Sequence, residues 1–111
     1  MSDNLLQCVH FLQLLGSPDT SKSQKVALIN TVSKAQLNSL SELSMNILNG
    51  NISITTEEAV KLRKFKSAIR ILSSRKHTIP NRREVVTFQL IQALLPPSLK
   101  FVNNSLQNVE S

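Results

Sequence analysis

Four places along the chain carry a local pattern that begins helices, and they divide much of the sequence into helical segments. In each, a short polar residue is followed three positions later by Glu or Gln, just where an apolar run of helical spacing starts: Ser21 with Gln24, Ser33 with Gln36, Thr55 with Glu58, and Asn81 with Glu84. Such a pair can satisfy otherwise free amide groups at a helix N-terminus reciprocally. We therefore predict that helices begin at these four positions.

With a further start after Ser2, the pattern predicts five helices and no strands. The expected helices cover residues 3–15, 22–32, 34–49, 56–74 and 82–95. Gly16 is expected to end the first helix, and the Asn49-Gly50-Asn51 run to reverse the chain after the third, because these residues readily take positive φ. The Pro96-Pro97 pair is expected to end the fifth helix. The predicted fold class is therefore all-α, a compact small bundle of about five helices.

The length and composition favour a single domain. A chain of 111 residues, 41% of them hydrophobic, can bury one modest core and is too apolar to be disordered throughout. We expect residues 1–102 to form one helical domain and residues 103–111 to form a flexible C-terminal tail.

A block of positive charge from Lys61 to Arg83 is the strongest functional signal. It holds nine of the thirteen Lys and Arg residues and no acid, in a chain of formal net charge +6. Electrostatics favours phosphate backbones, anionic membrane surfaces and acidic proteins as partners, although a basic face that is merely solvated is equally open. The candidate nucleic-acid-binding residues are Arg63, Lys64, Lys66, Arg70, Arg75, Lys76, Arg82 and Arg83.

If nucleic acid is the partner, the composition favours contacts with a duplex backbone. The chain has no Trp or Tyr and only four Phe, so an aromatic platform for stacking single-stranded bases is hard to build. A helix-turn-helix reader needs base-contacting side chains early in its second helix, where only Arg82 and Arg83 qualify. We therefore expect phosphate contacts and no sequence-specific readout.

The sequence predicts no catalytic residues, no metal site and no cofactor, so we expect that the protein is not an enzyme. Cys8, His10 and His77 do not match a metal-ligand spacing, and the seven acids include no pair with an evident acid-base role. Two glycines cannot make a glycine-rich phosphate loop. A single cysteine fits a reducing, intracellular compartment, and neither a signal peptide nor a membrane span is visible.

The C-terminal apolar run, residues 90–95 with Leu99, Phe101 and Val102, has two interpretations. It can close the core, or it can dock on a protein partner, on a second copy of the chain or on a lipid surface. The leading hypothesis is thus a non-enzymatic protein that binds duplex phosphates. The alternative is a helical adaptor that uses the basic face and the C-terminal apolar run, and a lipid-surface binder is the least favoured.

A spaced pattern over residues 37–95 carries a resemblance to a known group of proteins. Its residues are Leu43, Asn46-Ile47-Leu48-Asn49-Gly50-Asn51-Ile52, Ile54-Thr55, Lys61-Leu62-Arg63-Lys64-Phe65-Lys66, Ile69-Arg70, Leu72, Ser74-Arg75-Lys76, Arg82-Arg83 and Ala93-Leu94-Leu95-Pro96. This stretch resembles the small basic proteins encoded beside capsid genes in Polinton (Maverick) elements and related adenovirus-like viruses. The resemblance implies a virion or mobile-element accessory protein of DNA-condensing type, located in the nucleus or the virion.

Overall fold

Every regular element in the described part of the chain is an α-helix. The computed structural model describes residues 1–110, and the side chains of residues 1–107. Its helices are α1 (Asp3–Gln7), α2 (Val9–Gly16), α3 (Lys22–Asn30), α4 (Lys34–Leu48), α5 (Thr56–Arg63), α6 (Lys66–Ser73), α7 (Ile79–Glu84) and α8 (Phe88–Glu110). The all-α class is confirmed, whereas the described residues form eight helices and not about five.

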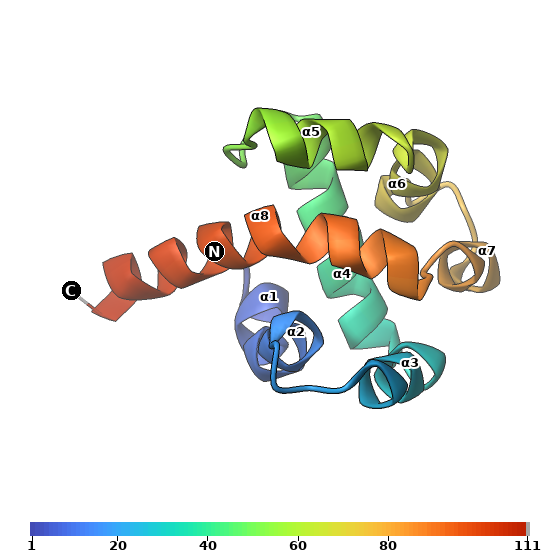
Figure 1. The fold of residues 1–111 in the computed structure, drawn as a ribbon, viewed down its shortest axis with the longest axis horizontal. Helices are drawn as coiled ribbons and strands as arrows, with labels where there is room; N and C mark the ends of the chain where they lie inside the picture. Colours follow the sequence, from blue (N-terminus) through green and yellow to red (C-terminus); the bar gives the residue numbers. More distant parts are fainter. Residues whose placement is uncertain (111) are drawn as a thin grey trace.

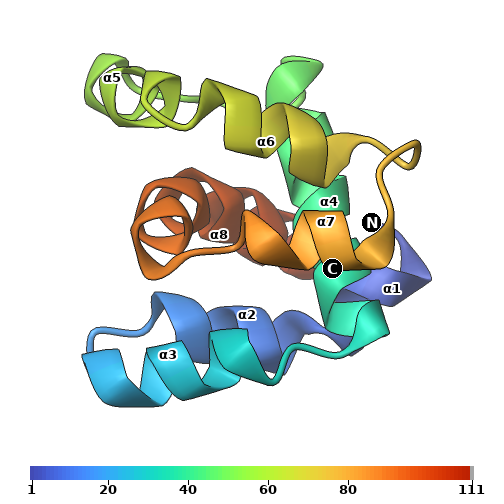
Figure 2. The same ribbon diagram turned by 90° about the vertical axis from the view of Figure 1, so that its right-hand side faces the viewer.

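The helices stack in three layers beside α4 (Figures 1 and 2). One outer layer holds α5 and α6, the middle layer holds α7 and α8, and the other outer layer holds α2 and α3. Helix α4 packs against α6, α7 and α8, and α8 also packs against α2, α3 and α5. The radius of gyration of 13.1 Å matches the value of about 13 Å expected for one compact domain of this length.

Leucine stripes from α1, α2, α4, α6 and α8 make the core between these layers. The largest fully buried side chains are Leu5, Leu12, Leu15, Leu37, Leu40, Leu43, Leu72, Leu90, Ile91, Leu94, Leu95 and Val102. Five of these twelve belong to the C-terminal apolar run, in which Leu99 and Phe101 are half-buried. The first interpretation of that run is therefore the one the structure shows, because the run closes the core.

Three of the four predicted helix starts are confirmed as complete capping boxes. In α3, α4 and α5 the cap hydroxyl accepts a hydrogen bond from the third helical amide, and the Gln or Glu side chain accepts one from the cap amide. The fourth prediction is wrong, because Asn81 lies inside α7 and the cap is Thr78, whose Oγ1 accepts from the Asn81 amide at 3.3 Å. Pro80 stands in the first turn, where a residue without an amide hydrogen is favoured, so this helix begins earlier than expected.

Three of the predicted helices are each interrupted, which explains the higher number. At Cys8 the backbone leaves the helical region (φ −99°, ψ 6°), and its amide is shared between the carbonyls of Asn4 and Leu5. At Phe65 the amide bonds to the carbonyl three residues back, that of Leu62, at 3.0 Å. After Glu84 the chain leaves α7, and Thr87 restarts the helix by accepting from the Leu90 amide at 3.2 Å.

Helix α8 continues through Pro96 and Pro97, so the predicted end before these prolines is wrong. An interior proline costs about 3 kcal/mol because it removes a hydrogen bond and crowds the preceding turn. Pro97 and Val102 are buried, and burying the turns beyond the proline pair offsets this cost. The helix runs on to Glu110 through most of the expected tail, whose flexibility stays a prediction, and Ser111 lies outside the described residues.

The turn after α4 needs a glycine, which gives a first prediction. Gly50 has φ +75°, its amide bonds to the Ile47 carbonyl at 3.1 Å, and the Asn51 amide bonds to the Asn46 carbonyl at 2.9 Å, as in a Schellman motif. We expect Gly50→Ala to lower the free energy of unfolding by about 1 to 2 kcal/mol, because a Cβ disfavours this left-handed conformation. Urea denaturation measures the loss, and Asn49→Ala, at φ −85°, is the control. Equal losses in the two variants would contradict this explanation.

Candidate nucleic-acid interface

Seven of the eight predicted phosphate ligands are exposed and follow one another from the end of α5 to α7. We call them the basic surface: Arg63, Lys64, Lys66, Arg70, Arg75, Lys76 and Arg83. Because helix α6 packs against α7, the basic residues of α6 lie close to the helix that carries Arg83 (Figure 1). The basic residues of α5 and α6 also lie in the layer opposite α2 and α3 (Figure 2).

The eighth candidate residue, Arg82, differs from the other seven because its side chain is buried, so it does not belong to the exposed basic surface. Only 8% of Arg82 is exposed, and its Nη1 donates to Ser41 Oγ at 3.1 Å and to Asn38 Oδ1 at 3.4 Å. Helix α7 packs this residue against α4. Arg83 instead is exposed, and its Nη1 donates to the Val32 carbonyl. Helix α7 therefore presents one of the two arginines of its last turn on the surface.

The charges of the basic surface have no acidic partner among the residues that the structure describes. The one ion pair in that part of the chain joins Lys100 Nζ to Glu58 Oε2 at 3.3 Å. Within the described residues, none of the seven cationic side chains is therefore neutralised by an ion pair. A surface with unpaired charge of one sign raises the local concentration of oppositely charged ligands and their association rate.

Glu58, at the start of α5, has a structural role, because its carboxylate caps this helix and pairs with Lys100. Partial burial of Glu58 opposes its charged form, but hydrogen bonding to the Thr55 amide and the Lys100 ammonium outweighs burial and lowers the pKa of Glu58. A lowered pKa in the folded state stabilises the fold above the ordinary carboxyl pKa, and this contribution is lost as pH falls through the lowered pKa. At neutral pH the carboxylate therefore stays charged and continues to cap α5.

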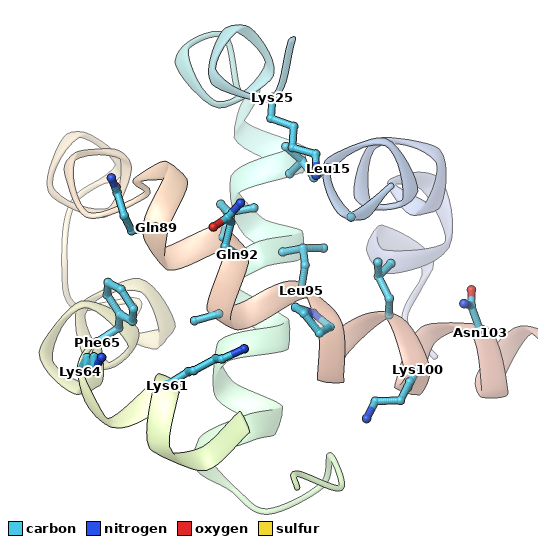
Figure 3. A pocket seen from close by; sticks show the side chains of 15 residues that line it. Leu15, Lys25, Lys61, Lys64, Phe65, Gln89, Gln92, Leu95, Lys100 and Asn103 are labelled. Carbon is cyan, nitrogen blue, oxygen red and sulfur yellow. The ribbon is translucent and has the colours of Figure 1, made fainter. Parts of the chain in front are cut away.

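Folding brings two distant lysines next to the block, and one of them, Lys100, is paired with Glu58. Lys25 and Lys100 join Lys61 and Lys64 around a pocket of about 560 Å³, with no acid in its lining (Figure 3). The pocket lies along α8, and its apolar lining includes Leu95. Lys25 and Lys100 lie far from the charge block in the sequence, so no local pattern could have assigned them to this site.

Cys8, His10 and His77, whose spacing does not match a metal site, differ in their exposure. Cys8 is buried, with Sγ 3.6 Å from the Ala35 carbonyl oxygen, while His10 and His77 are exposed. Over the described range, no three His, Cys, Asp or Glu side chains gather in a way that could hold a metal ion. None of the helices in this range combines the length and apolarity needed to cross a bilayer.

Comparison of the chain with protein-family models, with curated proteins and with solved structures found no match. The relationship to the basic proteins of Polinton elements therefore stays a hypothesis that rests on the sequence pattern alone.

Proposed function

We propose that this protein is a non-enzymatic binder of duplex nucleic acid, and that it holds backbone phosphates through the basic surface. The observation that carries the proposal is the exposure of seven Lys and Arg side chains from α5 to α7 without an acidic partner in the described part of the chain. Duplex DNA carries about one negative charge per 1.7 Å of axis, so it offers a dense row of counter-charges.

The aromatic side chains support phosphate contacts over base stacking. Phe11 is buried, and Phe65, Phe88 and Phe101 are half-buried. The Phe88 ring is also covered by Lys22, whose Nζ lies 5.1 Å from the ring centroid. Since base stacking needs open aromatic faces, a duplex backbone suits this surface better than a single strand.

The alternative is a helical adaptor for another protein, and it loses one of the two surfaces that it needs. In that hypothesis the partner contacts both the basic face and the C-terminal apolar run, but Leu94 and Leu95 lie in the core. A lipid-surface binder would lose the same apolar anchor. Either alternative would therefore lack the C-terminal apolar anchor.

We further propose a role as a virion or mobile-element accessory protein, located in the nucleus or the virion. This part of the proposal rests only on the sequence resemblance to the basic proteins of Polinton elements. A DNA-condensing function would use the same phosphate contacts.

The proposal predicts an affinity for duplex DNA that does not depend on base sequence. We expect two unrelated 20-base-pair duplexes to bind with affinities within about threefold of each other, because phosphate contacts carry no direct sequence information. Fluorescence anisotropy at about 100 mM salt, where phosphate binders of this kind still associate, measures both affinities. Anionic vesicles, tested in parallel, probe the lipid alternative. A strong preference for one duplex, or tighter binding to vesicles than to either duplex, would contradict the proposal.

A further inference from the structure

A second pocket, polar and of about 400 Å³, lies where α4 meets α1, the end of α6 and α7. Its lining includes three cationic residues, Lys34, Arg75 and Arg82, together with Asn38, Ser41 and Glu42. The volume falls within the range of about 300 to 1,000 Å³ that is usual for small-ligand sites. This pocket is separate from the lysine-lined pocket beside α8, with which it shares no residue.

Arg82 is the unusual member of this lining, because it is a buried charge without a counter-charge. With 8% of the residue exposed, its Nη1 bonds only to a hydroxyl and an amide oxygen, and its Nε is buried without any hydrogen-bond partner. A buried arginine normally pairs with a carboxylate, because an uncompensated charge away from water is costly. The guanidinium of Arg82 thus has unused donors beside a polar cavity.

The charge of the lining indicates which ligand would compensate Arg82. Three cations and one acid give a formal excess of +2 around the cavity. The acid, Glu42, is already engaged, since its Oε2 accepts a hydrogen bond from Ser2 Oγ at 2.6 Å. A dianion would balance the excess, and a guanidinium matches the geometry of a phosphate group by donating two parallel hydrogen bonds.

We propose that this pocket binds a phosphate group, with Arg82 at its base and the exposed Arg75 and Lys34 at its rim. The cavity is larger than one phosphate ion needs, so it has room for the molecule to which the phosphate is attached. Two sources share this chemistry: a small phosphorylated molecule, and the terminal phosphate of a nucleic-acid strand. The site is distinct from the proposed contact with internal duplex phosphates, although Arg75 belongs to both sets.

Titration of the ¹⁵N-labelled protein with inorganic phosphate and with pyrophosphate, at constant ionic strength, tests the site without any nucleic acid. We expect saturable amide shifts around residues 34, 38, 41, 75 and 82, and no such shifts with chloride. Arg75→Gln and Lys34→Gln should each weaken binding by about tenfold or more, because each removes a charge-assisted hydrogen bond. The control is Lys22→Gln, an exposed cation of α3 that lies outside the basic surface and lines neither pocket.

Both rim residues are exposed, so their variants should stay folded, and the test does not depend on replacing Arg82 itself. Shifts no larger than those with chloride would mean a pocket filled only by water and would overturn the proposal. It would also be overturned if Arg75→Gln and Lys22→Gln weakened phosphate binding equally.

A second pair of titrations distinguishes the two sources. Duplexes with 5′-phosphate and with 5′-hydroxyl ends are compared on the wild-type protein and on Lys34→Gln. Tighter binding of the phosphorylated duplex, lost in Lys34→Gln, would support the site and assign it to a strand end. Equal binding of the two duplexes, with saturable phosphate shifts, would support the site and assign it to a small molecule. The internal phosphate contacts are tested with 5′-hydroxyl duplexes, so failure of one proposal does not decide the other.

Discussion

Replacing Leu72 by alanine is expected to destabilise the domain by about 2 to 5 kcal/mol. Leu72 is fully buried at 0% exposure, on the face of α6 that packs against α4. The substitution removes buried methyl groups and leaves a cavity, and both effects favour the unfolded state. A domain of this length has only about 5 to 15 kcal/mol of stability, so the variant should lose a large part of it. Urea denaturation followed by circular dichroism measures the loss.

Two control variants test whether the loss of stability is specific to side chains buried in the core. Leu48→Ala, on the exposed end of α4 where the side chain is 46% exposed, should change the stability by no more than about 0.5 kcal/mol. Phe65→Ala should cost less than Leu72→Ala although Phe65 is larger, because Phe65 is half-buried beside the lysine-lined pocket. If Leu72→Ala were as mild as Leu48→Ala, α6 would not pack on α4 as described.

The helix starts could be predicted where the local chemistry was complete. Ser21, Ser33 and Thr55 each have a hydroxyl and a partner three residues later, and all three form the predicted capping boxes. The error at Asn81 has a local cause, because Thr78 with Pro80 offered an earlier start that competes with it. The positive φ of Gly50 was likewise readable from its place in the Asn-Gly-Asn run.

The helix interruptions and the continuation of α8 could not be predicted from local patterns. Cys8 and Phe65, where two of the interruptions fall, are neither glycine nor proline, and the apolar stripes continue across them. Conversely, Pro96 and Pro97 signal a helix end, but the packing of Val102 against the core overrides them. Both errors arise because tertiary burial outweighs local preference.

The sequence predicts which residues form the charge block, but not which of their side chains lie on the surface. Arg82 and Arg83 are neighbours in sequence, yet one is buried against α4 and the other is exposed, which only the orientation of α7 decides. Lys25 and Lys100 reach the lysine-lined pocket through packing of α8 between the outer layers. Sequence periodicity indicates which residues share a helix face, but it does not place helices relative to each other.

Neutralising four members of the basic surface should produce the largest effect on binding. At 0.1 M salt, each neutralised phosphate contributes roughly a tenfold gain in duplex affinity through counterion release. The variant Arg63→Gln with Lys66→Gln, Arg70→Gln and Lys76→Gln should therefore bind a 5′-hydroxyl duplex about three to four orders of magnitude more weakly. It omits Arg75, which also lines the polar pocket.

The folded state of this variant can be checked independently of binding. All four side chains are exposed and have no acidic partner among the described residues, so the helical spectrum and the urea midpoint should stay close to those of the wild type. Lys22→Gln removes one charge from α3, in the layer opposite α5 and α6, and should change the duplex affinity far less than any single change in the basic surface (Figure 2).

Salt titration of the duplex affinity is the most direct test of the basic surface as a phosphate-binding site. If all seven side chains contact phosphates, log affinity should fall linearly with log salt with a slope of about −6, or about −0.9 per contact. In the four-residue variant the slope should become shallower, at about −3. The account would be contradicted by a folded wild-type protein that shows no duplex binding at about 100 mM salt and micromolar concentration, or by a slope that stays the same in the variant.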